Sequence, residues 1–244
     1  MSKRKSVIFL VMIMAVIIVT ILLTAGCGKQ EKASESSQHK AVSSKTLESH
    51  AKKEWKHLTE DVPLSGGLMD TPGSWKLLDG VLTFGGKGYI WTKERYGDFV
   101  LDCEFKISPG GNSGIFFRTA DLKDPVQTGV EMQIYDTPHS QQPLKNDCGA
   151  LYDLLAPASY AEKAAGEWNH VIITCNDNFI SVTLNGVNII ENMDIDRWDT
   201  PGKNPDGTGN KFKKALKDFS REGHIGLQDH GDPVWFRSVK IKEL

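Results

Sequence analysis

The segment 110–153, GGNSGIFFRTADLKDPVQTGVEMQIYDTPHSQQPLKNDCGALYD, decides the fold because two strands can be read in it. Side chains of a strand alternate between its two faces, so residues two apart stand side by side. In the second strand, residues 130–135, one face is apolar and the other carries an acid, an amide and a phenol: Glu131, Gln133 and Tyr135. Such a row fits a solvated face of an antiparallel sheet. With Arg118 on the neighbouring strand, it equally fits a binding face.

The sequence on both sides of this segment also has the pattern of short strands. Residues 99–107 alternate apolar and polar side chains, which is typical of a strand with one buried face. Two Asx-Gly pairs, at 79–80 and 185–186, each separate two strand-like runs and predict β-hairpins. One helical pattern, residues 210–219, lies in the long insertion 194–222. Many short strands and one short helix predict an all-β fold, either a two-sheet sandwich or a jelly roll.

Residues 1–27 have the features of a bacterial lipoprotein signal peptide. A positive start is followed by an apolar run, residues 7–23, and by small residues ahead of Cys27, which is the expected lipidated cysteine. An uncleaved transmembrane anchor is the alternative, because the run is close to the roughly 18 residues that span a bilayer. Both interpretations place the rest of the chain outside the cytoplasmic membrane, in the cell envelope.

Residues 28–53 are expected to be a flexible tether. They are rich in Ser, Lys, Glu and Gln and have almost no large apolar side chains, so they cannot bury enough surface to fold. Residues 54–244 remain as one domain of ordinary size. The formal net charge is −2, and the sequence has no cluster of basic residues that would form a basic stripe. The composition therefore argues against a nucleic-acid partner.

Three cysteines follow the tether: Cys103, Cys148 and Cys175. An odd number without a C-x-x-C pair argues against a disulfide framework or a thiolate zinc site, although a single bridge remains open. Cys103 and Cys175 stand at strand-like positions, so they are expected to be small buried residues.

Seven motifs stand in order along the domain: NSGIFFR at 112–118, EMQIYD at 131–136, GALYDLLAP at 149–157, GEWNHV at 166–171, LNG at 184–186, NPDGTGNKFKKALKDF at 204–219 and GLQDHGDPVWFRSVKIKEL at 226–244. Over residues 54–244 they resemble a bacterial domain described as a 3-keto-glucoside 1,2-lyase and 3-keto-2-hydroxy-glucal hydratase, or 3-keto-disaccharide hydrolase. The resemblance implies a concanavalin-like jelly-roll sandwich of two antiparallel sheets, in which the sugar site is the concave sheet.

The resemblance also implies an enzyme that cleaves 3-keto-glucosides. A ketone at C3 makes the C2 proton acidic, so a base removes that proton, the C1 substituent leaves by elimination, and water adds to the glucal. Such a site needs a base near C2, a donor or metal at the C3 oxygen and an acid at the leaving oxygen. The implied functional partner is a glucoside 3-oxidoreductase that makes the ketone.

Two other functions are compatible with such a fold: a non-catalytic carbohydrate-binding module and an ordinary glycoside hydrolase. Glycosidases of similar fold carry an E-x-D-x-x-E strand, and EMQIYD has the amide of Gln133 where that strand has a second carboxylate. Retaining hydrolysis needs two carboxylates about 5–5.5 Å apart. The amide therefore argues against ordinary retaining hydrolysis.

The candidates for proton transfer are Glu131, His139 and His230. Histidine titrates near neutral pH, although a surface histidine is as common an outcome for His139. Arg118 is expected to be either an ion partner of Glu131 or a clamp on a hydroxyl or the enolate. The expected substrate-binding residues are Arg118, Gln133, Tyr135, Asn146, Tyr152, Gln228 and Asp229.

A divalent metal ion is an open possibility. The three proton-transfer candidates could ligate one if their loops meet, and Asp206 in NPDG could hold calcium through its oxygens. Neither set has diagnostic spacing, and Asn-Pro-Asp-Gly is more often a turn. Trp91 and Trp235 are candidate platforms for a sugar ring, with a core position as the alternative for Trp235.

Overall fold

The computed structural model describes residues 54–59, 68, 75–84 and 88–244. The expected signal peptide with Cys27 and the expected tether lie outside the described residues. Among the residues that are described, no helix has the length and apolar character that crossing a bilayer needs.

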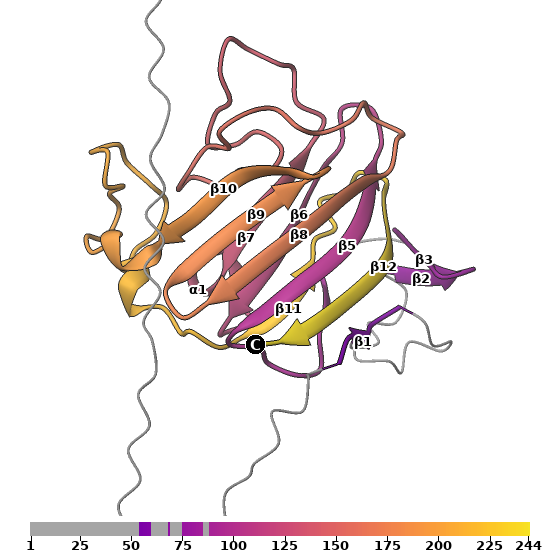
Figure 1. Ribbon diagram of the computed structural model, residues 1–244, viewed down its shortest axis with the longest axis horizontal. Coiled ribbons are helices and arrows are strands. Elements are labelled where there is room, and N and C mark those ends of the chain that lie inside the picture. Colours follow the sequence, from indigo (N-terminus) through magenta and orange to yellow (C-terminus); the bar gives the residue numbers. More distant parts are fainter. Residues whose placement is uncertain (1–53, 60–67, 69–74, 85–87) are drawn as a thin grey trace, which may run out of the picture. The chain divides into compact units, whose positions relative to one another are not determined.

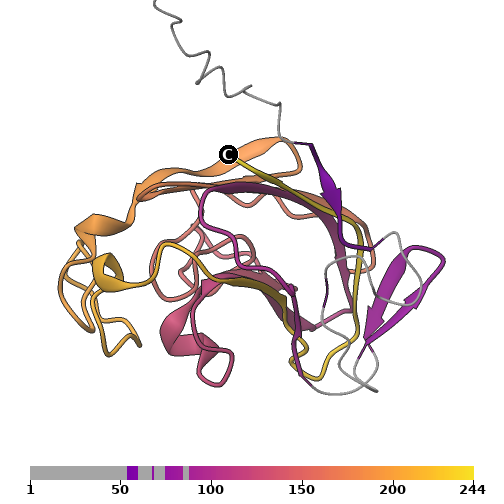
Figure 2. The same ribbon diagram turned by 90° about the horizontal axis from the view of Figure 1, so that it is seen from below.

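The domain is a sandwich of two antiparallel sheets, which Figure 2 shows as two layers. The larger sheet has the order β10-β9-β8-β5-β12-β3-β2, with β1 paired to β12 (Figure 1). Its strands are β1 (Lys56–His57), β2 (Trp75–Leu78), β3 (Val81–Phe84), β5 (Phe99–Ile107), β8 (Asn169–Asn176), β9 (Phe179–Leu184), β10 (Val187–Asp194) and β12 (Val234–Glu243). The prediction of an all-β sandwich is confirmed.

The smaller sheet has the order β4-β11-β6-β7. Its strands are β4 (Ile90–Trp91), β6 (Asn112–Thr119), β7 (Val130–Tyr135) and β11 (His224–Leu227). The segment 110–153 therefore supplies two of its four strands, β6 and β7, which pair in antiparallel register. The chain around Gly149 and Ala150 bonds to Gln133 and so covers the outer edge of β7.

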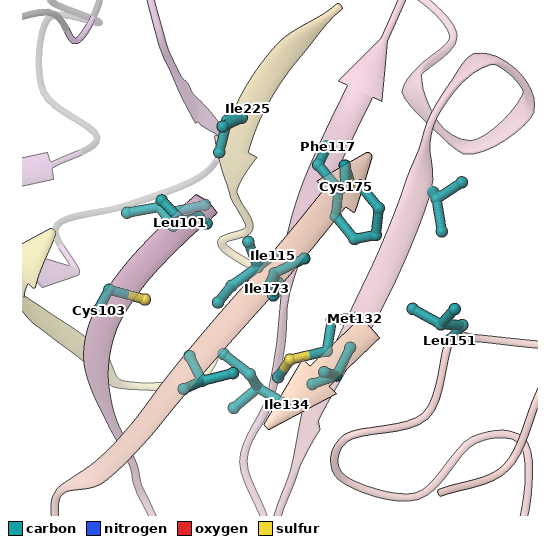
Figure 3. Close-up of a cluster of buried hydrophobic side chains, with 14 of the residues drawn as sticks. Leu101, Cys103, Ile115, Phe117, Met132, Ile134, Leu151, Ile173, Cys175 and Ile225 are labelled. Carbon is teal, nitrogen blue, oxygen red and sulfur yellow. The ribbon is translucent and has the colours of Figure 1, made fainter. Parts of the chain in front are cut away.

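The core forms between the sheets because each strand turns its apolar face inward. In β5 every second residue is buried, as the alternation of residues 99–107 predicts. Figure 3 shows side chains of this core from both sheets, among them Leu101 of β5, Ile115 of β6 and Ile173 of β8. The cysteines Cys103, Cys148 and Cys175 are buried and free, so the single bridge left open by the sequence does not form among them.

Both predicted hairpins are confirmed. β2 and β3 meet at Asp79 and Gly80, and β9 and β10 meet at Asn185 and Gly186. All four turn residues have positive φ, between 49° and 83°, as the tight turn of a two-residue hairpin requires. Asx and Gly tolerate this backbone conformation better than other residues, and for that reason these pairs were informative.

The prediction of a helix at residues 210–219 is wrong. Only a 3-10 turn, η2 (Leu216–Asp218), forms there, as does η1 (Ile195–Arg197) earlier in the insertion, and the α-helix α1 (Pro125–Thr128) lies between β6 and β7. The backbone of Asn210 bonds to Gly202, and its side-chain oxygen accepts the backbone N–H of Phe212. These bonds occupy groups that a helix would use. The apolar pattern still has its effect, because the insertion buries three side chains against the domain: Phe212, Leu216 and Phe219.

Candidate active site

Glu131 lies on the face of β7 that points away from the core, because its neighbours Val130 and Met132 point into it. The side chains of Glu131 and Gln133 are nevertheless only 7% and 4% exposed. The row is therefore not a solvated face, and that alternative is wrong. The Glu131 carboxylate lies directly over Gly114 of β6, where any Cβ atom would collide with it. A glycine is needed there so that the carboxylate can lie flat on the sheet.

Burial raises the pKa of Glu131 to about 7, against the lowering effects of Lys211 and Gln228. The Lys211 Nζ is 3.6 Å from Glu131 Oε2, and burial lowers the pKa of Lys211 in turn. A carboxyl group that titrates near neutral pH can take up and release a proton at the pH where most cells work. The pair thus has the electrostatics of a general base with a positive charge beside it.

Lys211 comes from the insertion and is held in place by two other segments. The side chain of Gln127 in α1 donates to the Lys211 carbonyl and accepts the N–H of Lys213. Asp153 accepts the backbone N–H of Lys211, and the ammonium group lies 4.2 Å from the centre of the Tyr152 ring. The insertion, α1 and the chain after β7 therefore combine to bring Lys211 to Glu131.

An aromatic cluster occupies the other side of the same face. The rings of Tyr89 and Trp91 stack with centroids 5.0 Å apart, and Phe116 meets both rings edge-on. The Trp91 ring lies across Gly226, and Trp91 is only 7% exposed. Trp91 therefore supports the Tyr89 ring and offers little surface as a platform for a sugar ring. Gln228 links the cluster to the acid, since its amide donates to Tyr89 Oη at 3.3 Å and also lowers the pKa of Glu131.

The structure thus gathers four of the residues expected from the sequence on one face: Glu131, Gln133, Tyr152 and Gln228. It adds two that sequence reasoning missed. Lys211 lies in the segment predicted to be a helix, and a lysine on such a helix is expected to point into solvent. Tyr89 lies next to a strand of only two residues, β4, and no pattern pointed to it.

Arg118 is not the ion partner of Glu131, and that prediction is wrong, because Lys211 takes this place. The guanidinium group is 2% exposed and donates to the carbonyls of Gly97 and Asp177 and to Asp98 Oδ1, at 3.0, 2.7 and 3.1 Å. A register shift between β6 and β11 and a φ of +52° at Arg118 interrupt the alternation of β6. The side chain therefore does not follow the face of Phe116.

His139 lies in a different place from Glu131. Its Nε2 is 2.8 Å from Glu162 Oε1, and its ring stacks on Tyr160 with centroids 4.0 Å apart. Together with Tyr135 it lines a cavity to which Glu131 does not contribute. Asn146 is exposed on the loop that follows.

The loop after β11 holds the last two candidates. His230 is exposed. Asp229 is 8% exposed and accepts the backbone N–H of Gly231, as expected for a side chain that stabilises its own turn. The proton-transfer candidates Glu131, His139 and His230 therefore do not form one cluster.

No group of three or more His, Cys, Asp or Glu side chains is placed to hold a metal ion within the described residues. Asp206 instead pairs with Lys145 at 2.8 Å and accepts from Thr208. Trp235 is half-buried on the outer face of the larger sheet, where the Lys106 Nζ lies 4.5 Å from its ring, so the core alternative for it is wrong.

The fold and this face define the class of protein: a jelly-roll sandwich that holds an acid–base pair and an aromatic cluster on the outer face of its smaller sheet. The chain belongs to the family of 3-keto-alpha-glucoside-1,2-lyase-like domains, whose family model matches residues 44–242. The resemblance that the seven motifs carry is thereby confirmed.

Three relatives illustrate the family. A 3-keto-disaccharide hydrolase of Bacteroides thetaiotaomicron is 28% identical over 206 residues, which are 71% of this chain and 71% of the relative. A crystal structure from Parabacteroides distasonis, described as a candidate glycosyl hydrolase, is 36% identical with a TM-score of 0.73, over 79% of this chain and 100% of that one. A second such structure from the same organism is 28% identical with a TM-score of 0.56, over 78% of this chain and 88% of that one.

Proposed function

We propose that this chain cleaves 3-keto-disaccharides and related 3-keto-glucosides. Membership of the family and the name of the Bacteroides relative support the substrate class. The single observation that carries the proposal is the buried Glu131, with a pKa of about 7 beside Lys211, on a sheet face that also carries Tyr89 and Gln228. Such a group is suited to remove a carbon-bound proton that a neighbouring ketone has made acidic.

The proposed reaction has an elimination and an addition. Glu131 takes the C2 proton, and the electron pair of the C–H bond forms an enolate with the C3 oxygen. The enolate then expels the C1 substituent, which leaves with a proton, and a C1–C2 double bond remains. Water adds its oxygen to C1 and a proton returns to C2, so the sum is hydrolysis of the glycosidic bond.

Lys211 and Tyr152 are the donors that this reaction needs. The ammonium group of Lys211 lies between the Glu131 carboxylate and the Tyr152 ring, so a sugar over Glu131 has a positive charge within reach of its C3 oxygen. A donor aimed at a developing oxyanion contributes about 3–4 kcal/mol of transition-state stabilisation in comparable sites. Tyr152, whose ring lies 4.2 Å from the Lys211 ammonium group, is the proposed donor to the sugar or the leaving oxygen.

The surroundings of Glu131 argue against ordinary retaining hydrolysis. A second carboxylate beside Glu131 would raise its pKa, but the cause that raises it is burial, and no carboxylate is among the groups that shift it. The residue two positions along the strand is the amide Gln133, which cannot act as a nucleophile or an acid. One carboxylate suffices for proton removal from C2, whereas retaining hydrolysis needs two.

A substrate panel tests the proposal. The purified domain, residues 54–244, is incubated with an aryl 3-keto-glucoside and with the same aryl glucoside unoxidised, and release of the aryl alcohol is followed. We expect release from the keto substrate alone. Equal turnover of the unoxidised glucoside would identify an ordinary glycoside hydrolase instead. Binding of either sugar without turnover would identify a carbohydrate-binding module.

Solvent exchange separates the proposed mechanism from direct displacement at C1. In deuterated water, elimination and rehydration place deuterium at C2 of the released 3-keto sugar, because the C2 proton is lost to Glu131 and replaced from solvent. Mass spectrometry of product formed in short incubations measures this. Product without deuterium at C2 would contradict the elimination.

Replacing Lys211 by methionine is expected to move the acidic limb of the pH–rate profile upward by about 1–3 pH units. An opposite charge within about 4–6 Å lowers a carboxyl pKa by that amount, and Lys211 is 3.6 Å from Glu131. Without it, the pKa of Glu131 rises above about 7, and less of the base form is present at neutral pH. The control is Lys211→Arg, which keeps the charge and should keep the limb near its original position. An unmoved limb in the methionine variant would remove Lys211 from the proton-transfer site.

We also propose that the chain is exported and attached to a membrane through a lipid on Cys27, so that it works in the cell envelope beside an oxidoreductase that makes the ketone. The lipoprotein-like pattern of residues 1–27 supports this. Labelling cells with a tagged fatty acid tests it, and the label should be absent from a Cys27→Ser chain. A serine variant that is labelled as strongly would contradict the assignment.

A further inference from the structure

The cavity lined by His139 and Tyr135 opens at the end of the sandwich where β7 leaves the smaller sheet. It has a volume of about 250 Å³. Phe105 and Ile107 at the end of β5 border its inner end but are only 0% and 4% exposed, and the half-buried Tyr135 and Thr137 form part of its wall. It therefore lies between the ends of the two sheets, away from the outer face that carries Glu131.

The polar part of this cavity is Glu162 with His139. The Glu162 side chain is only 7% exposed, and its Oε1 lies 2.8 Å from His139 Nε2. Its Oε2 accepts the backbone N–H of Ala161 at 3.1 Å. A carboxylate has about four lone-pair positions, so these bonds leave acceptor capacity for a ligand. His139 is 52% exposed, which places it at the mouth.

These groups are held in position by their surroundings. The His139 ring stacks on Tyr160 with an interplanar angle of 13°. The Tyr160 hydroxyl donates to Asp147 Oδ2 at 3.1 Å and accepts the backbone N–H of Ser140 at 3.0 Å. A site whose side chains are already ordered loses little conformational entropy when a ligand binds.

The lining fits a neutral sugar ring. The half-buried ring of Tyr135 can pack against the C–H face of a pyranose, and a buried carboxylate with an imidazole and a hydroxyl at the wall can bond its hydroxyl groups. Lys163 lines the same cavity and supplies a positive charge there, so a charged ligand is not required. The volume of about 250 Å³ suits one ring.

We propose that this cavity is a second carbohydrate-binding site, which takes a single neutral pyranose unit and is separate from the site at Glu131. Tyr135 and Glu131 are four residues apart on β7, which corresponds to about 13 Å along a strand. The two sites thus lie toward opposite ends of one strand. The second site binds sugar without any chemistry, so it stands whether or not Glu131 is a catalytic base.

Nuclear magnetic resonance titration with methyl α- and β-D-glucopyranoside tests the proposal on the domain 54–244. We expect shifts in the backbone amides of Thr137, Glu162 and Ala164 that saturate together. Ala164→Phe fills the mouth of the cavity, and Glu162→Gln removes the charged acceptor. Each is expected to weaken binding by about tenfold or more. Ala164 is exposed, so the larger side chain should not disturb the core.

The matched control is Glu131→Gln, which should bind the glucosides at this cavity as tightly as the original chain. Thermal unfolding of each variant confirms that it is folded. If the amides of the cavity do not shift at high millimolar glucoside, the proposal is overturned. It is also overturned if binding survives Ala164→Phe and Glu162→Gln but is lost in Glu131→Gln, because the sugar then occupies the Glu131 site alone.

Discussion

Replacing Glu131 by glutamine is expected to lower turnover of a 3-keto-glucoside by about 10²–10⁴-fold, the usual contribution of a positioned acid–base group. Glutamine keeps the shape of the side chain that lies across Gly114, so the neighbouring groups should stay in place. It cannot accept the C2 proton. The measurement is kcat/KM for an aryl 3-keto-glucoside at several pH values, and the limb near pH 7 should disappear with the activity.

The stability of the same variant provides the control. Burial raises the pKa of Glu131 from 4.5 to about 7 in the folded chain. The folded state therefore favours the protonated form of Glu131. The stabilisation that this preference contributes to the free energy of unfolding is fully present below pH 4.5 and is lost as the pH rises through about 7. Glutamine stays neutral, so the variant should be at least as stable as the original chain at pH 8. Full activity in the variant would exclude Glu131 as the base, and a variant that is unfolded at the assay temperature would show that the loss of activity reflects unfolding.

Replacing Arg118 by methionine is expected to destabilise the domain by about 3 kcal/mol. The change leaves the carbonyls of Gly97 and Asp177 without their donor and leaves Asp98 without its cation. Hydrogen bonds that involve a charged group contribute about 1.5–3 kcal/mol each, and the loss of one partner leaves the other without a hydrogen bond. The measurement is the urea concentration at the midpoint of unfolding, compared between variants that unfold with the same m-value.

Arg237→Met is the matched control for Arg118. Arg237 also bonds a carboxylate, with its Nε and Nη2 at 2.8 and 2.9 Å from Glu104. Its side chain is 38% exposed on the outer face of the larger sheet, where a surface ion pair contributes about 0–1 kcal/mol. If Arg118→Met instead removed turnover and left stability unchanged, Arg118 would act on the substrate, as the sequence first suggested.

The sandwich was predictable because its strands obey local rules. The alternation in residues 99–107 and the Asx-Gly pairs each depend on a few neighbouring residues. The predictions for Arg118 and for residues 210–219 were wrong because tertiary contacts prevailed there. A bulge turned Arg118 off its expected face, and the bonds of Asn210 to Gly202 and Phe212 replaced those of a helix.

The site was predictable in part: Glu131, Gln133, Tyr152 and Gln228 share one face as expected, whereas Lys211 and Tyr89 were missed. Glu131 stood out because an acid, an amide and a phenol shared one face of a strand whose other face is apolar. The histidines His139 and His230 were chosen by residue type; the structure places His139 in a cavity to which Glu131 does not contribute, and His230 is exposed on the loop after β11. Lys211 is 80 positions further along the chain, and no local pattern relates it to β7. A pairing of this kind is visible only once the insertion is placed.

The attachment of Lys211 has a consequence for how the protein becomes active. Neither sheet includes the segment that carries it, and that segment is fastened by Gln127 and Asp153. The same insertion buries Phe212, Leu216 and Phe219 in the core, so the core is complete only when this segment is docked. Catalytic competence is therefore expected to appear together with the final burial of aromatic side chains in a refolding experiment.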